Sequence, residues 1–101
     1  MVSLEVVFNE EKAKSAGYTC EELMDIVRAQ AEKNGVEEVS YGVFMNDTPE
    51  DLARVGSIVP RLNRSNRGLF DYMDKCILDV DGDKEDAKAA IMERNQRKTA
   101  V

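Results

Sequence analysis

Apolar and polar residues alternate at the start of the chain, where Leu4, Val6 and Phe8 are separated by single residues. A period of two is typical of a strand with one face in the core. We therefore expect a first strand that ends near Asn9. The polar residues 10–16 tolerate a helix and are followed by a glycine, which favours a short helical turn after the strand.

The next segment carries signals for both ends of a helix. Thr19 and Glu22 have the spacing of a capping box, in which each side chain accepts a hydrogen bond from the other residue's backbone. Gly35 follows Asn34 at the far end, where a left-handed residue closes a helix. Between these signals the apolar positions recur every three or four residues, at Cys20, Leu23, Val27 and Ala31. The pattern predicts an amphipathic helix that packs on a sheet.

A second strand is predicted after this helix, because every second residue is apolar. The positions concerned are Val39, Tyr41, Val43 and Met45. With these side chains inward, Phe44 would lie on the opposite face of the sheet, as would Val7 in the first strand. Two apolar residues there indicate a candidate interface, with another protein or with a second copy of the chain as the partner.

The second half begins with helix signals. Thr48 is a good helix cap, and Pro49 suits the first helical position. Ser57 offers a second start, which would place Pro60 in a first turn where its missing N–H costs little. We expect a kinked helix or two short ones, followed by a loop at residues 63–68.

Residues 69–80 fit two patterns. Most of the apolar side chains share one helical face, whereas alternation near the end would suit a strand. We favour a helix to about Leu78, with a third strand as the alternative. Asp81 and Gly82 predict a turn, and Asp83 predicts the cap of a last helix with basic residues at its far end.

Together these elements predict a small α+β domain over residues 1–98, with a loose tail at 99–101. Its sheet would have two strands, or three if the ambiguous segment were extended, with three to four helices packed on one face. A chain of 101 residues suits one domain rather than two.

Catalytic chemistry is not indicated. The chain has no histidine, which excludes Ser-His-Asp and Cys-His nucleophiles and any metal site built with imidazole. Cys20 lies at a helix N-terminus, but its place on the apolar stripe and the glutamates beside it favour a structural thiol. Cys76 has no functional indication. We expect no catalytic residue and no cofactor, and we predict that the protein is not an enzyme.

A calcium site was the other chemical candidate. Asp79, Asp81 and Asp83 have the alternating start of a calcium loop, but such a loop needs glycine at its sixth position and glutamate at its twelfth. The chain has Lys84 and Ala90 there. A turn and a helix cap account for the same aspartates, so we expect no metal.

The net charge of −6 argues against general affinity for nucleic acids or anionic membranes. No apolar run is long enough to span a membrane, and the first residues do not resemble a signal peptide, so we expect a cytoplasmic protein. The charge is unevenly distributed, because residues 1–50 hold eleven acids and four bases whereas residues 51–101 hold nine acids and ten bases.

Residues 52–70 contain no acid, and their four arginines form the best candidate binding surface, since arginine matches phosphate and carboxylate groups. These are Arg54, Arg61, Arg64 and Arg67. A solvated loop that offsets the acidic half is the simpler interpretation. We expect a small accessory protein that binds another protein. The alternatives are a nucleic-acid-associated regulator that uses the arginines, and an acidic inhibitor of a basic protein surface.

Overall fold

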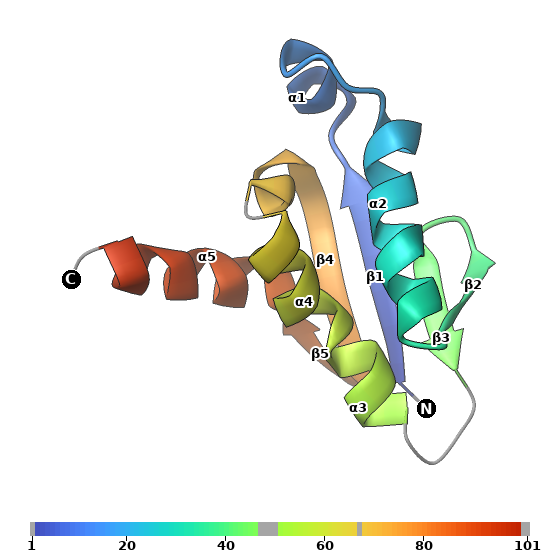
Figure 1. Cartoon of the computed structure of the whole chain (residues 1–101). Helices are drawn as coiled ribbons and strands as arrows, with labels where there is room; N and C mark the ends of the chain where they lie inside the picture. Colours follow the sequence, from blue (N-terminus) through green and yellow to red (C-terminus); the bar gives the residue numbers. More distant parts are fainter. Residues whose placement is uncertain (1, 47–50, 67, 100–101) are drawn as a thin grey trace.

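The computed structural model describes residues 2–46, 51–66 and 68–99, which form an α+β domain (Figure 1). Its elements, in chain order, are β1 (Val2–Phe8), α1 (Glu10–Ser15), α2 (Cys20–Lys33), β2 (Glu37–Ser40), β3 (Val43–Asn46), α3 (Asp51–Gly56), α4 (Ile58–Ser65), the 3-10 helix η1 (Leu69–Tyr72), β4 (Met73–Val80), β5 (Asp83–Asp86) and α5 (Ala87–Thr99).

The five strands form one antiparallel sheet in the order β2-β3-β1-β4-β5. The α+β class was predicted, but the expected sheet of two or three strands is wrong. The first four strands, with the helices between them, follow the β-α-β-β-α-β pattern of ferredoxin-like domains, and β5 extends the sheet beside β4. The N-terminal strand therefore lies at the centre, paired on both sides.

The predicted second strand is a hairpin of two strands. Gly42 has a φ of +73°, a conformation that glycine adopts without strain, and it turns the chain back between β2 and β3. Its carbonyl accepts a 2.8 Å hydrogen bond from the Val6 N–H. The turn reverses which residues face inward, so Phe44 lies opposite Leu4 in the core.

The segment favoured as a helix is η1 followed by the strand β4. A bulge explains the helix-like spacing: Met73 pairs with Phe8 and Lys75 with Val7, so two steps along β4 match one step along β1. Met73 and Cys76, three residues apart, are both buried as a result. Three-residue spacing of buried side chains normally indicates a helix, and here it arises from the bulge.

The last helix begins later than predicted. Residues expected as its cap and first turn form β5, which pairs with β4, and α5 starts at Ala87. The capping side chain is Asp86, which accepts a 3.0 Å hydrogen bond from the Ala89 N–H, rather than Asp83. The predicted turn at Asp81 and Gly82 is confirmed.

The signals around α2 are confirmed at both ends. The Thr19 hydroxyl accepts a 3.1 Å hydrogen bond from the Glu22 N–H, and the Glu22 carboxylate accepts one of 3.1 Å from the Thr19 N–H. At the other end Gly35 has a φ of +74°, and the Val36 N–H donates to the Ala31 carbonyl at 2.8 Å. These bonds complete a Schellman motif.

The short helix α1 and the division into α3 and α4 are also confirmed. Ser57 stands at the N-terminus of α4, but its side chain makes no capping hydrogen bond there. The predicted cap Thr48 and Pro49 lie outside the described residues.

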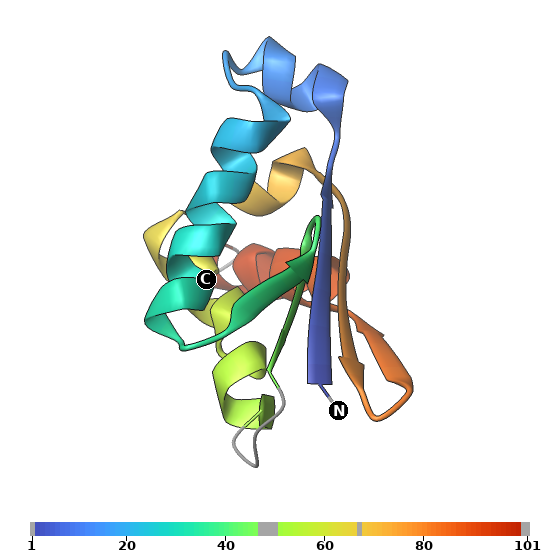
Figure 2. The ribbon, with the colours of Figure 1, turned by 90° about the vertical axis from the view of Figure 1, so that its right-hand side faces the viewer.

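Helices α2, α3 and α4 cover one face of the sheet, and the other face is open (Figure 2). The core between the helices and the sheet is centred on fully buried Leu4, Phe44, Phe70, Leu23 and Ile58. Among the described residues, no helix combines the length and the apolar character required to cross a bilayer.

Candidate functional site

One face of the sheet is not covered by any element of the described chain, and we call it the open face. In β1 the residues alternate, so that Ser3, Glu5 and Val7 point away from the core. The strand register adds their neighbours on the same face. The complete set is Ser3, Glu5, Val7, Glu37, Ser40, Val43, Met45, Lys75, Ile77, Asp79, Lys84 and Asp86.

The two residues of the predicted interface lie on opposite faces. The Val7 side chain is 39% exposed on the open face, whereas Phe44 is 0% exposed in the core. Phe44 is thus excluded from any interface of the folded domain. The sequence pattern does not reveal the open-face apolar residues Val43, Met45 and Ile77, because it predicts core positions for the first two and a helix for the third.

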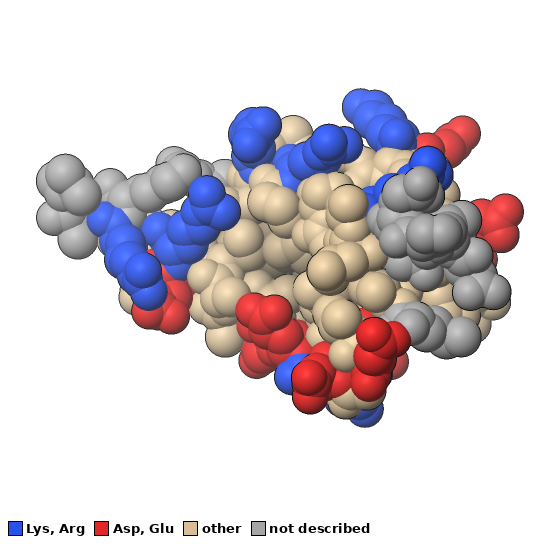
Figure 3. Space-filling model, turned by 90° about the horizontal axis from the view of Figure 1, so that it is seen from below, with Lys and Arg blue, Asp and Glu red and all other residues tan. Residues whose placement is uncertain are grey.

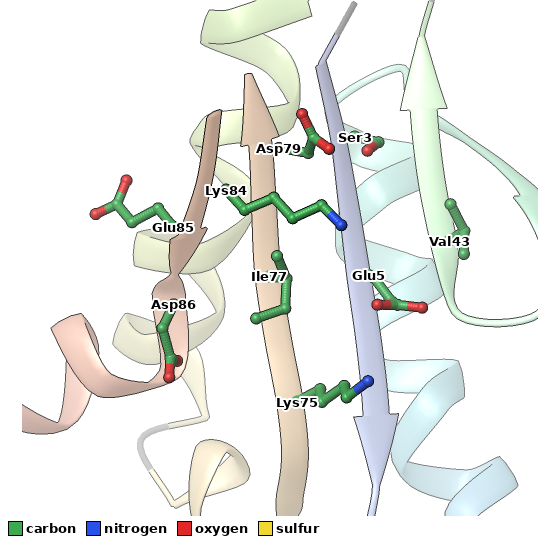
Figure 4. A pocket seen from close by; sticks show the side chains of 9 residues that line it. All are labelled: Ser3, Glu5, Val43, Lys75, Ile77, Asp79, Lys84, Glu85 and Asp86. Carbon is green, nitrogen blue, oxygen red and sulfur yellow. The ribbon is translucent and has the colours of Figure 1, made fainter. Parts of the chain in front are cut away.

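A hollow of about 530 Å³ lies on the open face. Its floor includes Val43 and Ile77, which flank Glu5 in one row across β3, β1 and β4. The side chains of Lys75 and Lys84 extend toward β1 from either side of this row (Figure 4). The hollow therefore combines an apolar floor with both signs of charge.

The charges at the centre of the open face offset one another. Asp79 lies directly across from Lys84 in the register of β4 and β5. Glu5 lies diagonal to Lys75, within reach of long side chains. The borders differ, because Glu37 lies across from Met45 and Asp86 lies across from Ile77. The open face consequently has a nearly neutral centre between acidic borders.

The three described arginines of the predicted surface are exposed, and two of them also contact the end of α2. Arg61 donates a 2.9 Å hydrogen bond to the side-chain oxygen of Asn34, which is 8% exposed. The Arg54 guanidinium lies against Gly35, where an added Cβ would stand 2.9 Å from its Nη1. Both arginines thus lie at the C-terminal end of α2, whose carbonyl groups favour positive charge. Arg64 is exposed on α4, and Arg67 lies outside the described residues.

Seen from below, the molecule carries opposite charges on opposite borders (Figure 3). Lys and Arg side chains gather on the border where the helices lie, and Asp and Glu side chains gather on the border of the open face. In this view the basic and the acidic side chains are therefore separated in space.

A cluster around Arg28 joins α2 to the β2–β3 hairpin. Its guanidinium donates hydrogen bonds to Glu21, to Asp25 at 2.9 Å and to Glu38 at 2.6 Å, and it lies 5.5 Å from the ring centroid of Tyr41. The Arg28 hydrogen bond lowers the pKa of Glu38, with a further contribution from the Gly42 N–H. We interpret this cluster as structural, because all three carboxylates accept hydrogen bonds from the one guanidinium that joins α2 to the hairpin.

The two thiols are free and poorly suited to nucleophilic chemistry. Burial raises the pKa of Cys76 to about 12, and burial followed by the charges of Glu10 and Asp74 raises the pKa of Cys20. Among the described residues, no group of three or more Cys, Asp or Glu side chains is arranged to hold a metal ion. Asp79, the first residue of the rejected calcium motif, accepts a 2.8 Å hydrogen bond from the Gly82 N–H in the hairpin turn.

The chain matches no model of a known protein family, no curated protein and no solved structure. Its function therefore has to be inferred from the geometry described above.

Proposed function

We propose that this protein is a small cytoplasmic accessory protein that binds another protein through the open face of its sheet. One observation carries the proposal: Val7, Val43, Met45 and Ile77 share a face that no described element covers. Antiparallel sheets often have one solvated face, but that face is then mostly polar. A group of apolar side chains within a polar border is typical of a protein interface.

Binding fits the hollow better than catalysis does. Its polar groups are carboxylates and lysines from exposed or half-buried positions, together with Ser3. General acid–base or nucleophilic chemistry needs a reactive group held next to its base in a site that excludes water. A broad, solvated surface with apolar and charged groups instead suits recognition of a complementary surface.

The arginine surface is the weaker candidate. Arg61 is engaged with Asn34, and Arg54 packs on the backbone at Gly35. Their positions are explained by the end of α2, so a nucleic-acid partner is not needed to account for them. The acidic border of the open face also disfavours an approach by phosphate groups from that side.

The test compares two pairs of substitutions in the full chain. Val43→Thr with Ile77→Thr removes apolar contacts from the open face while retaining residues that favour strands. Tyr18→Gln with Leu52→Gln removes two exposed apolar side chains that lie outside the sheet and serves as the control.

Immobilised wild-type and variant proteins would be incubated with native lysate, and the captured proteins quantified by mass spectrometry. We expect the open-face pair to lose partners that the wild type and the control pair retain, with circular dichroism showing that both variants are folded. Equal capture by all three proteins would refute the proposed docking face.

A further inference from the structure

We infer that the partner of the open face is a protein surface with an apolar centre and a rim of lysine or arginine side chains. This inference rests on the proposed function and specifies the partner's chemistry. It follows from how charge and apolar area are arranged on the face.

A partner that covers the centre of the open face needs few charged groups there. Glu5 stands between Val43 and Ile77, and the neighbouring Lys75 offsets its charge. Asp79 is likewise offset by Lys84 across the strand pair. A partner can therefore place apolar side chains over this row without leaving an isolated charge buried, which would be unfavourable.

The charges at the borders of the open face determine which sign of charge the rim of the partner surface should carry. Glu37 borders the face at β2, and Asp86 borders it at β5. The hairpin turn beside β5 adds Asp81, and acidic side chains gather on the border of the open face in Figure 3. Opposite charges at a rim guide association and disfavour wrong partners, so basic residues fit here.

The same charges disfavour a second copy of the chain. A two-fold dimer through this face would place each acidic border against the corresponding surface of the other copy. Each copy also carries a net charge of −6, which adds a repulsion between them. A basic protein has neither disadvantage, and we therefore assign the face to one.

The test uses two synthetic peptides that differ only in charge. One alternates valine with lysine, and the other alternates valine with glutamate. Binding to the full chain would be followed by fluorescence anisotropy at low salt and at about 0.15 M ionic strength, where exposed charges are largely screened beyond about 8 Å. Amide chemical shifts would locate the contact. We expect the lysine peptide alone to bind, with shifts centred on Glu5 and Ile77.

Two variant pairs separate the rim from the overall charge. Glu37→Gln with Asp86→Asn neutralises the rim, and asparagine retains an oxygen that can accept the hydrogen bond from the Ala89 N–H. Glu11→Gln with Glu32→Gln neutralises two exposed acids on α1 and α2. Both pairs change the net charge by the same amount. Since an exposed charge pair contributes modestly, the rim pair should weaken lysine-peptide binding about three- to tenfold, and the control pair should change it less than about twofold.

The remaining outcomes overturn the inference. Equal weakening by both variant pairs would indicate general attraction to an acidic protein, and tighter binding of the glutamate peptide would indicate an acidic partner. If neither peptide bound, a basic partner surface would be excluded. A concentration-dependent dimer that Val43→Thr with Ile77→Thr abolished would exclude it as well. The capture experiment from lysate with Val43→Thr and Ile77→Thr tests separately whether the open face is a docking face, whatever the charge of the partner.

Discussion

The side-chain oxygen of Asn34 accepts a 2.9 Å hydrogen bond from the guanidinium of Arg61, which joins the end of α2 to α4. The Asn34 amide nitrogen donates to the Arg54 carbonyl at 2.8 Å and to the Ser57 hydroxyl at 3.0 Å. A nearly buried polar side chain is stable only when such partners are present. Arg61 is therefore part of the packing between helices, in addition to being a surface cation.

This role predicts different effects for two arginines on the same helix. Arg61→Ala should lower the free energy of unfolding by about 0.5–1.5 kcal/mol, because it removes a hydrogen bond to a nearly buried group. Arg64→Ala, which leaves the hydrogen bond to Asn34 intact, should change it by less than about 0.5 kcal/mol. Urea unfolding followed by circular dichroism measures both values. Equal values for the two variants would show that the bond to Asn34 adds no stability.

The turn at Gly42 predicts a second difference. A Cβ at this position would stand 2.4 Å from the Val6 carbonyl oxygen, whereas one at Gly82 meets nothing within 4 Å. Both glycines have positive φ, so alanine strains the backbone at either site. The additional clash should make Gly42→Ala about 1–3 kcal/mol more destabilising than Gly82→Ala. Thermal unfolding of the two variants tests this, and a smaller effect at Gly42 would contradict the tight packing of the hairpin on β1.

Local signals predicted the elements that depend on local chemistry. The ends of α2 follow from Thr19, Glu22 and Gly35, whose hydrogen bonds join residues only a few positions apart. The break between α3 and α4 likewise follows from nearby residues. Such signals need no knowledge of the tertiary structure.

The strands that were missed depend on distant partners. β4 is extended because it pairs along the whole of β1, and the bulge near Val7 gives its buried residues a helical spacing. β5 is short and exposed along its whole length, so it has no apolar alternation to detect.

The open face was predicted only through Val7, since its other apolar residues come together across strands that the pattern did not resolve. A continuous strand through Gly42 would place Phe44 on this face, whereas the turn at Gly42 places it in the core.

The ion cluster of α2 predicts a pH dependence. The hydrogen bond from Arg28 lowers the pKa of Glu38 in the folded protein below its ordinary value of 4.5. A lowered folded-state pKa stabilises the fold above the unfolded pKa, and this contribution disappears as the pH falls through the folded value. Wild type should thus exceed Glu38→Gln in stability at neutral pH, and the difference should shrink progressively below about pH 4.5.

Urea unfolding at a series of pH values measures this difference. Glu37→Gln provides the control, because Glu37 is exposed on the opposite face of β2. A Glu38→Gln difference that stayed constant from neutral to acidic pH would show that the Arg28 hydrogen bond does not favour the ionised carboxylate.

The two thiols should react slowly in the folded protein, and in a defined order. The thiolate is the reactive form, and the pKa of each thiol is raised, chiefly by burial. Cys20 is partly exposed whereas Cys76 is buried, so at pH 8 an aromatic disulfide reagent should modify Cys20 first and Cys76 only when the domain opens. Cys20→Ser and Cys76→Ala assign the two phases, and denatured protein supplies the rate of an unprotected thiol. Labelling of native Cys20 at that denatured rate would refute the structural assignment and reopen a reactive role at the start of α2.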